Sequence, residues 1–188
     1  MKLFKKLAAA ALAAVLALSM VGCGGVTPGG GATMNDTQAT ALATLVNTDR
    51  KAAGKKEELT RSAEAEAILA DYAKAMVDYL VDRNETTDAA GAAAVQEAMR
   101  KLSQLEIDGK KVDMNKSMMA QGFAINNVTV TPEMIKSMAV NSKRKDGENI
   151  TTVDTWAPLV NADGSYLAVV WAEKSGATAV IAYNIVLK

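Results

Sequence analysis

The side chains that could carry chemistry are few, because the 188-residue chain contains one cysteine and no histidine. Without histidine there is no Ser-His-Asp or Cys-His nucleophile pair, and no imidazole ligand for a metal ion. A single cysteine excludes an intrachain disulfide, a Cys-x-x-Cys redox pair and a cysteine-rich zinc site. The 21 basic residues balance 21 acidic ones, which argues against a nucleic-acid-binding protein. What remains is acid–base chemistry by carboxylates and modification of the cysteine.

Five acidic residues outside the expected helices are candidate general acids or bases: Asp108, Asp113, Glu148, Asp154 and Asp163. Two carboxylates in one pocket can cleave a glycan or a peptide, and histidine is not essential for such a hydrolase. Asp108 and Asp163 each precede a glycine, however, so turn formation accounts for both. Glu148 lies in a charged loop, and Asp154 fits a solvated strand face. We therefore expect no catalytic residue among them.

Three other clusters each have a functional and a structural interpretation. Residues 161–165 (NADGS) could supply oxygen ligands to calcium, but a hairpin turn explains them and we expect no metal. The basic run 143–145 could touch anionic lipid or wall polymers, or it is a solvated loop. A group of methionines could form an adaptable binding surface, although methionine at helical spacing more often fills a core. These are Met114, Met118, Met119, Met134 and Met138.

The cysteine ends a segment typical of a secretion signal. Three lysines within the first six residues precede an uncharged apolar run at 7–21, which is shorter than the roughly 20 residues that cross a bilayer. The last four residues of the segment, 20–23 (MVGC), resemble the lipobox of bacterial lipoproteins, although Leu is more usual where Met20 stands. The resemblance implies a lipoprotein signal peptide at 1–22 and lipidation of Cys23. An ordinary signal peptide, or a short transmembrane helix with a chance cysteine, is the alternative.

Removal of this signal leaves 18 basic against 21 acidic residues, so the mature chain is mildly acidic. Residues 23–35 hold the lipidated cysteine and a Gly-rich tether, whose composition buries too little apolar surface to order itself. Residues 36–188 then form a single domain. We expect it on the extracytoplasmic face of the cell membrane, close to the surface because the tether is short.

Apolar periodicity predicts four helices in this domain. The first starts at Asp36 or Thr37 and stops near Gly54, and the second follows Ser62 and has the strongest amphipathic pattern. After a polar loop at 84–88, a third helix covers 89–104 with Asp88 as its N-cap. The fourth begins with Thr131 as N-cap and Pro132 in its first turn, and it fades by 141–142.

The remaining pattern is strand-like. Asp108-Gly109 indicates a tight turn, residues 114–122 carry no clear pattern, and 123–130 has the composition of a strand. The C-terminal third predicts a three-stranded antiparallel meander, with strands at 151–160, 165–173 and 178–187 and turns at 161–164 and 174–176. Helices packed on a C-terminal antiparallel sheet give the α+β class.

The order of these elements resembles the CAP superfamily (the cysteine-rich secretory, antigen 5, pathogenesis-related fold), which in bacteria is often an SCP-like extracellular domain. Residues 45–54 (LVNTDRKAAG) look like the family's opening helix, a hydrophobic-Asn-x-x-Arg stretch that ends in Gly. Leu59, the helix after it, Gly122–Ile125 in the place of Gly-Glu-Asn-Ile, and the helix from Thr131 to Ser142 follow in the family's order. The resemblance covers about 37–187 and implies an α-β-α sandwich.

The departures from the family bear on function. Family members often have a cleft with two His and two acidic residues that can hold a divalent metal. Here both His are absent, Phe123 and Ala124 stand where Glu and Asn are expected, and Lys145 lies near the second His position.

We therefore expect a CAP-like domain that binds a protein, peptide or envelope component without catalysis, cofactor, metal or nucleic acid. A candidate groove lies near Phe123, Ser142 and Trp156, and we expect the other strand aromatics to be core or half-buried. A carboxylate-dependent hydrolase acting on envelope glycan or peptide, and a purely structural envelope protein, are the alternatives.

Overall fold

The computed structural model describes residues 31–125, 127–146 and 149–188, which belong to one compact unit. The predicted signal peptide, Cys23, most of the tether and Glu148 lie outside the described residues, as do the side chains of Arg144 and Lys145. Within the described part of the chain, no helix is long and apolar enough to cross a bilayer.

The four predicted helices are present: α2 (Asp36–Ala52), α3 (Ala63–Val81), α4 (Glu85–Gln104) and α5 (Pro132–Val140). Their starts follow from side chains that accept hydrogen bonds from the first turn. The N-cap of α2 is Asn35 rather than Asp36 or Thr37. Helix α4 begins before the predicted Ala89, because Asn84 and Thr87 form a reciprocal capping box. The predicted cap Thr131 is confirmed, with Pro132 behind it.

The central sheet has the order β1-β8-β9-β5, formed by β1 (Thr33–Met34), β8 (Tyr166–Lys174), β9 (Ala177–Ile185) and β5 (Met118–Ala124). These four strands pair antiparallel, and the short β2 (Thr60–Arg61) lies parallel to the start of β8. The β8–β9 hairpin turns at Ser175-Gly176, where φ is 47° and 78°. Two successive left-handed residues suit the right-handed twist of the strands, and the predicted turn at 174–176 is confirmed.

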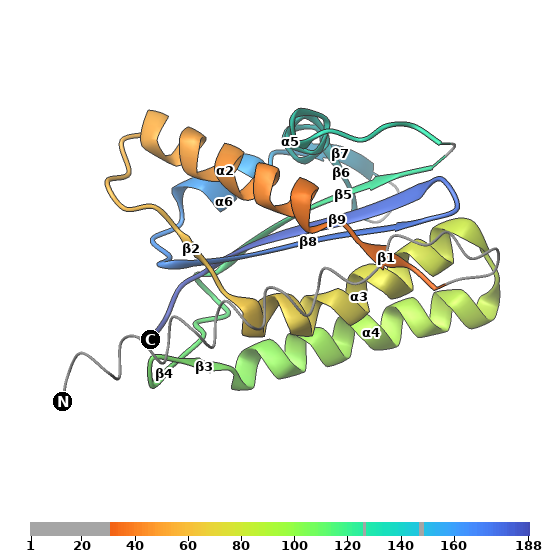
Figure 1. The fold of residues 1–188 in the computed structure, drawn as a ribbon, viewed down its shortest axis with the longest axis horizontal. Coiled ribbons are helices and arrows are strands. Elements are labelled where there is room, and N and C mark those ends of the chain that lie inside the picture. The colour runs from red at the N-terminus through yellow and green to blue at the C-terminus, as the bar shows by residue number, and fades with distance from the viewer. Residues whose placement is uncertain (1–30, 126, 147–148) are drawn as a thin grey trace. The chain divides into compact units, whose positions relative to one another are not determined.

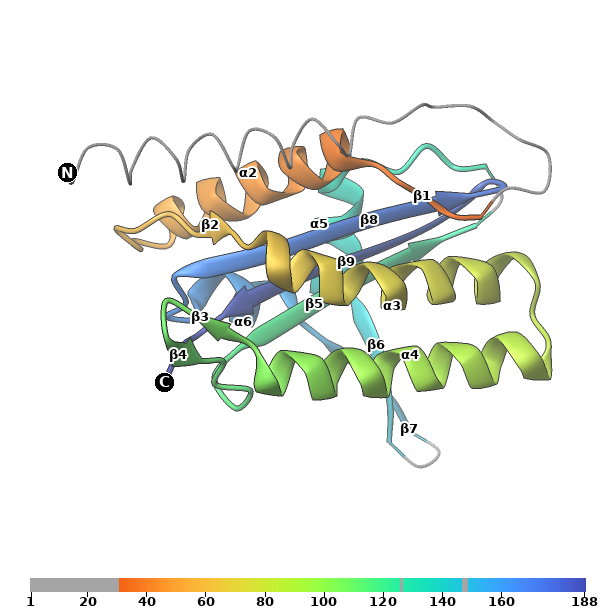
Figure 2. The same cartoon turned by 60° about the horizontal axis from the view of Figure 1, so that its bottom comes forward.

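Helices cover both faces of this sheet (Figures 1 and 2). On one face α2 and α5 pack with a further helix, α6 (Trp156–Asn161), in a core that includes Val180 and Ala182 of β9. On the other face α3 and α4 pack in a core that includes Ala179 and Ile181. Because β9 is buried on both faces, its sequence is an almost continuous apolar run. The α+β class is confirmed, with the sheet as the middle layer.

The predicted C-terminal meander is wrong, because the strand expected at 151–160 ends at Val153 and does not join the central sheet. Residues 156–161 are helix α6, since the Asp154 carboxylate accepts hydrogen bonds from the backbone N–H groups of Trp156 and Ala157 and starts a helical turn. The preceding residues form β7 (Asn149–Val153), which pairs only with β6 (Ser142–Asp146) in a separate hairpin. The predicted turn at 161–164 therefore joins a helix to β8.

Strand β5 takes the place of the missing third strand. It pairs with β9 along its whole length, from Met118 opposite Asn184 to Ala124 opposite Thr178. The strand predicted at 123–130 thus starts earlier and ends at Ala124. The small hairpin of β3 (Glu106–Ile107) and β4 (Lys110–Lys111) forms around Asp108-Gly109, as the turn signal predicted.

The outer edge of β8 is covered over its whole length. Strands β1 and β2 pair with its two ends, and between them the Glu66 carboxylate accepts a hydrogen bond from the Val169 N–H. Arg61 holds that carboxylate in a two-pronged ion pair. Residues 33–34, which the sequence placed in the tether, are therefore part of the domain.

Candidate functional site

The motif residues of the opening helix hold the fold together. The Asn47 side-chain amide accepts from the Leu59 N–H at 2.9 Å and donates to the Leu59 carbonyl at 3.0 Å. This pair of bonds ties the loop after α2 back onto the helix. Gly54, at φ 83°, lets the chain leave the helix in the left-handed conformation.

Arg50 is almost wholly buried, and Nη1 of its guanidinium donates at 2.7 Å to the carbonyls of Val160 and Ala162 at the end of α6. Burial lowers the pKa of Arg50, and the nearby charge of Asp163 opposes that shift. The side chain still carries its charge, because arginine is not deprotonated in proteins. Arg50 is therefore a structural bridge between α2 and α6.

Asn184 of β9 also binds backbone carbonyls at the end of α6. It is fully buried, and its Nδ2 donates to the Leu159 carbonyl at 2.7 Å and to the Ala162 carbonyl at 3.3 Å. Gly164 passes so close that a Cβ there would lie 1.8 Å from Asn184 Oδ1. Among the described buried side chains, only Arg50 Nε and Asn184 Oδ1 lack a hydrogen-bond partner.

Two of the three candidate groove residues lie close together. Trp156 is buried at the start of α6, and its Nε1 donates to Asp49 Oδ2 at 2.8 Å. Ser142 donates its hydroxyl to the Met138 carbonyl, and it lies 3.4 Å from the hydroxyl of Thr155, the neighbour of Trp156. Five residues meet where α2, α5, β6 and the start of α6 come together, and we call them the junction cluster: Asp49, Lys136, Ser142, Thr155 and Trp156.

Lys136 adds the positive charge of the junction cluster. Its Nζ lies 2.6 Å from Asp49 Oδ2 and 6.0 Å from the centre of the Trp156 ring. One carboxylate oxygen thus accepts from both an ammonium and an indole. The cluster can offer hydrogen bonds and a cation at the surface, but its carboxylate is already engaged.

Sequence reasoning missed Asp49 and Lys136. Asp49 lies three residues after Val46, on the buried side of α2, which is a signal that could have found it. No local pattern marks Lys136, whose partners come from distant parts of the chain.

Phe123 is not part of the junction cluster. It packs in the core under α3 and α4, whereas its neighbour Ala124 packs in the core on the opposite face. Alternation along β5 explains the separation, because successive side chains of a strand point to opposite faces. Gly122, on the same side as Ala124, lets α5 approach closely: a Cβ there would lie 2.7 Å from Ile135 Cδ1.

The candidate carboxylates have separate structural partners. Asp154 accepts hydrogen bonds from backbone N–H groups at the start of α6. Asp108 accepts a hydrogen bond from the Tyr166 hydroxyl, and this bond raises the pKa of the tyrosine. Asp163 is exposed and pairs with Lys55 at 2.6 Å, a hydrogen bond that lowers the pKa of the carboxyl. A lowered pKa is the opposite of what a general acid needs at neutral pH.

Asp113 accepts from the Asn115 N–H, and one of its oxygens lies 3.9 Å from Lys116 Nζ. Residues 161–165, the candidate calcium ligands, also have local partners, since Asn161 donates to the Ala157 carbonyl in its own helix. Among the described residues, no three or more Cys, Asp or Glu side chains form a group that could hold a metal ion.

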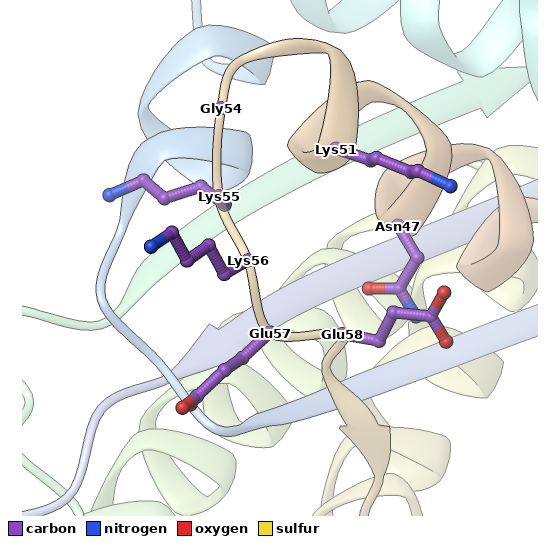
Figure 3. A pocket seen from close by; sticks show the side chains of 7 residues that line it. All are labelled: Asn47, Lys51, Gly54, Lys55, Lys56, Glu57 and Glu58. Atoms are coloured by element: carbon purple, nitrogen blue, oxygen red, sulfur yellow. The ribbon is translucent and has the colours of Figure 1, made fainter.

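A shallow pocket of about 410 Å³ lies at the loop between α2 and β2. Figure 3 shows that its charged side chains diverge: Lys51 and Glu58 extend to one side, Lys55, Lys56 and Glu57 to the other. A second pocket, about 340 Å³, lies between Lys116 and Asp163. A specific ligand site needs polar groups that converge, which the first pocket lacks.

The methionines and strand aromatics mostly fill the cores. Met114 and Met119 pack under α3 and α4, and Met138 packs on the other face. Trp171 is fully buried and Tyr183 nearly so. In the basic run, Lys143 donates to the Thr152 hydroxyl across the β6–β7 hairpin at 2.6 Å.

Comparison with known proteins gives no relative: no protein-family model matches the chain, and neither the curated proteins nor the solved structures yield a match.

Proposed function

We propose that the chain is a membrane-anchored, extracytoplasmic lipoprotein whose domain is CAP-like and binds a protein, peptide or envelope component without catalysis. The anchor rests on the sequence alone. The one cysteine follows a basic segment, an uncharged apolar run and Gly22. The given sequence has no second cysteine with which it could form a disulfide or a redox pair. A covalent lipid on Cys23 supplies membrane attachment, since each buried methylene contributes about 0.8 kcal/mol.

The CAP-like part is supported by what the motif residues do. Asn47, Arg50 and Gly54 each perform a separate structural task around α2. The order of α2, α3, β5, α5 and the β8–β9 hairpin, with helices on both faces of the sheet, also agrees with the resemblance.

The observation that carries the non-catalytic part is the placement of Phe123 and Ala124. These residues stand where the resemblance implies polar cleft groups, and both pack against cores on opposite faces of the sheet. On the α2 face, the Asp49 carboxylate is held by Trp156 and Lys136. Neither arrangement leaves a base or nucleophile facing a substrate.

The surface that suits a binding partner is the β6–β7 hairpin beside the junction cluster. Figure 2 shows the hairpin projecting from the body of the domain. Among the described residues, its two strands pair with each other and with no strand of the central sheet. Ile150 on β7 is 69 % exposed, the most exposed large apolar side chain described. An exposed large apolar side chain on a hairpin that projects from the domain is a feature of protein- and peptide-binding surfaces.

Photo-crosslinking in cells tests this proposal. A crosslinking amino acid at Ile150, in the full-length chain, should form a discrete adduct with an envelope component. The matched position Ser103, exposed on α4, should form none. Equal labelling from both positions, or none from Ile150, contradicts a binding role for the hairpin.

An activity assay addresses the hydrolase alternative. The purified protein incubated with cell-wall glycan or envelope peptides should release no product. Product release that is abolished by Asp49→Asn, or by the asparagine variant of one candidate aspartate, would establish an enzyme instead.

A further inference from the structure

Six large apolar side chains of the described residues are more than one-third exposed, and four of them gather at one end of the sheet. Those four are Met34, Val81, Ile125 and Val128, with exposed fractions of 40, 41, 37 and 48 %. We call these four residues the apolar end. Single exposed apolar residues are ordinary on soluble proteins, whereas a cluster indicates a contact surface.

Contacts to the tip of the β8–β9 hairpin hold the apolar end together. Met34 pairs with Ala172 on β8, and the Asn127 N–H, between Ile125 and Val128 in the chain, donates to the Gly176 carbonyl. Figures 1 and 2 both show β1, the β8–β9 turn, the loop after β5 and the end of α3 at the same end of the domain.

An ion pair adds the end of α3 to this group. Lys174, next to the hairpin turn, binds the Asp78 carboxylate at 2.6 Å, and Val81 follows Asp78 by one helical turn. The four side chains therefore come from four segments that converge on one hairpin.

The chain reaches the domain at this same end. The first described strand, β1, pairs Thr33 with Glu173 beside the hairpin tip. Ten residue steps separate Cys23 from Thr33, and a chain spans at most about 3.3–3.6 Å per residue. A lipid on Cys23 would thus lie no further than about 35 Å from Thr33. Helix α3 spans about 28 Å at 1.5 Å per residue, so the other end of the domain lies about that distance from the end where the chain enters.

Charges at the apolar end do not form a basic patch. Lys174 is paired with Asp78, and Arg83 lies over the Tyr79 ring at 5.9 Å. Asp82 and Glu85 are exposed beside it. Few unengaged cations are therefore present to attract anionic lipid headgroups, and apolar contact is the stronger candidate.

We propose that the apolar end is a membrane-docking surface that rests on the bilayer and inserts its side chains at the boundary between headgroups and acyl chains. This inference rests on the proposed lipid anchor. The lipid brings this end to the bilayer, and exposed aliphatic side chains with a neighbouring tyrosine suit that interface. The opposite end, with the α2–β2 loop, then faces away from the membrane.

Site-specific fluorescence in proteoliposomes tests the orientation. The lipidated full-length protein has no free thiol if Cys23 is acylated, so Val128→Cys or Glu57→Cys provides one labelling site. Glu57 is the matched control because it is exposed and belongs to the loop between α2 and β2, which Figure 1 shows at the opposite end of the domain. An environment-sensitive dye at position 128 should shift to shorter wavelength and lose several-fold more fluorescence to nitroxide-labelled lipids than the dye at position 57.

The outcomes separate the two proposals. Equal quenching at both positions in a protein whose mass shows a lipidated Cys23 overturns the orientation and leaves the anchor intact. A mass that shows unmodified Cys23 overturns the anchor and, with it, the docking inference. Quenching at position 128 that needs anionic lipid contradicts apolar insertion. Both substituted residues are exposed, and matching circular dichroism spectra would show that the variants fold.

Discussion

The two helical layers are attached to the sheet by different means. On the α2, α5 and α6 face, side-chain hydrogen bonds to backbone groups join the elements, from Asn47, Arg50 and Asn184. On the α3 and α4 face, Ala, Leu and Val side chains fill the core, and the polar contacts with the sheet come from the long helix α3 through Glu66, Tyr72 and Asp78. Helices α5 and α6 have only 9 and 6 residues, against 19 and 20 for α3 and α4. Short helices bury too little surface to fix their own position, so polar contacts must fix it.

A pair of glycine substitutions should show the largest difference between the layers. At Gly164, on the α6 side, an added Cβ would lie 1.8 Å from Asn184 Oδ1 and 2.6 Å from the Ile185 carbonyl. Because backbone cannot yield easily, Gly164→Ala should lower the free energy of unfolding by on the order of 3 kcal/mol.

The matched substitution is Gly91→Ala in α4. There the nearest atom is the flexible Met76 Sδ, at 3.7 Å. Alanine is favoured in a helix interior, so this variant should gain about 0.5–1 kcal/mol. Urea unfolding of both variants measures the contrast, and equal losses would show that the layers do not differ as described.

The next effect concerns buried and exposed arginines. Arg50→Met removes the donor to the Val160 and Ala162 carbonyls and should cost about 2 kcal/mol, because those buried acceptors lose a partner. Arg100→Met on α4 is the control, since Arg100 is exposed and pairs only within its own helix. Its unfolding midpoint should stay close to that of the parent. If Arg50→Met is equally mild, the polar attachment of α6 is wrong.

The smallest effect is a pH dependence at Asp163. The hydrogen bond from Lys55 lowers the pKa of the Asp163 carboxyl, so this pair stabilises the fold at neutral pH and ceases to do so as the pH falls through the lowered pKa. Asp163→Asn should therefore melt slightly below the parent at pH 7, and the difference should vanish once the pH lies below the lowered pKa. A difference that grows on acidification would contradict the assignment. Thermal melts across that range provide the measurement.

The same contrast explains what the sequence could reveal. Helix α3 was predictable because its apolar residues repeat over several turns, and its burial through Leu69 and Tyr72 follows that pattern. Helix α6 was not, since six residues give no period and the β-branched residues before it favour a strand. Its start depends on the Asp154 side chain, which alternation assigned to a solvated strand face.

Strand β5 and the candidate groove show a second limit. Residues 118–122 are rich in methionine and small residues rather than β-branched ones, and the pairing with β9 fixes their structure. Ser142 lies beside Thr155, the neighbour of Trp156, whereas Phe123 packs on the other face of the sheet. The Trp156–Asp49 bond joins residues 107 apart in the chain, so no local pattern could reveal it.

The central claim, a lipid anchor on Cys23, is tested most directly by detergent phase partitioning of the full-length protein beside its Cys23→Ser variant. The account predicts that the parent enters the detergent phase and sediments with membranes, while the variant moves to the aqueous phase. A Cys23→Ser protein that remains membrane-bound and still enters the detergent phase would contradict it.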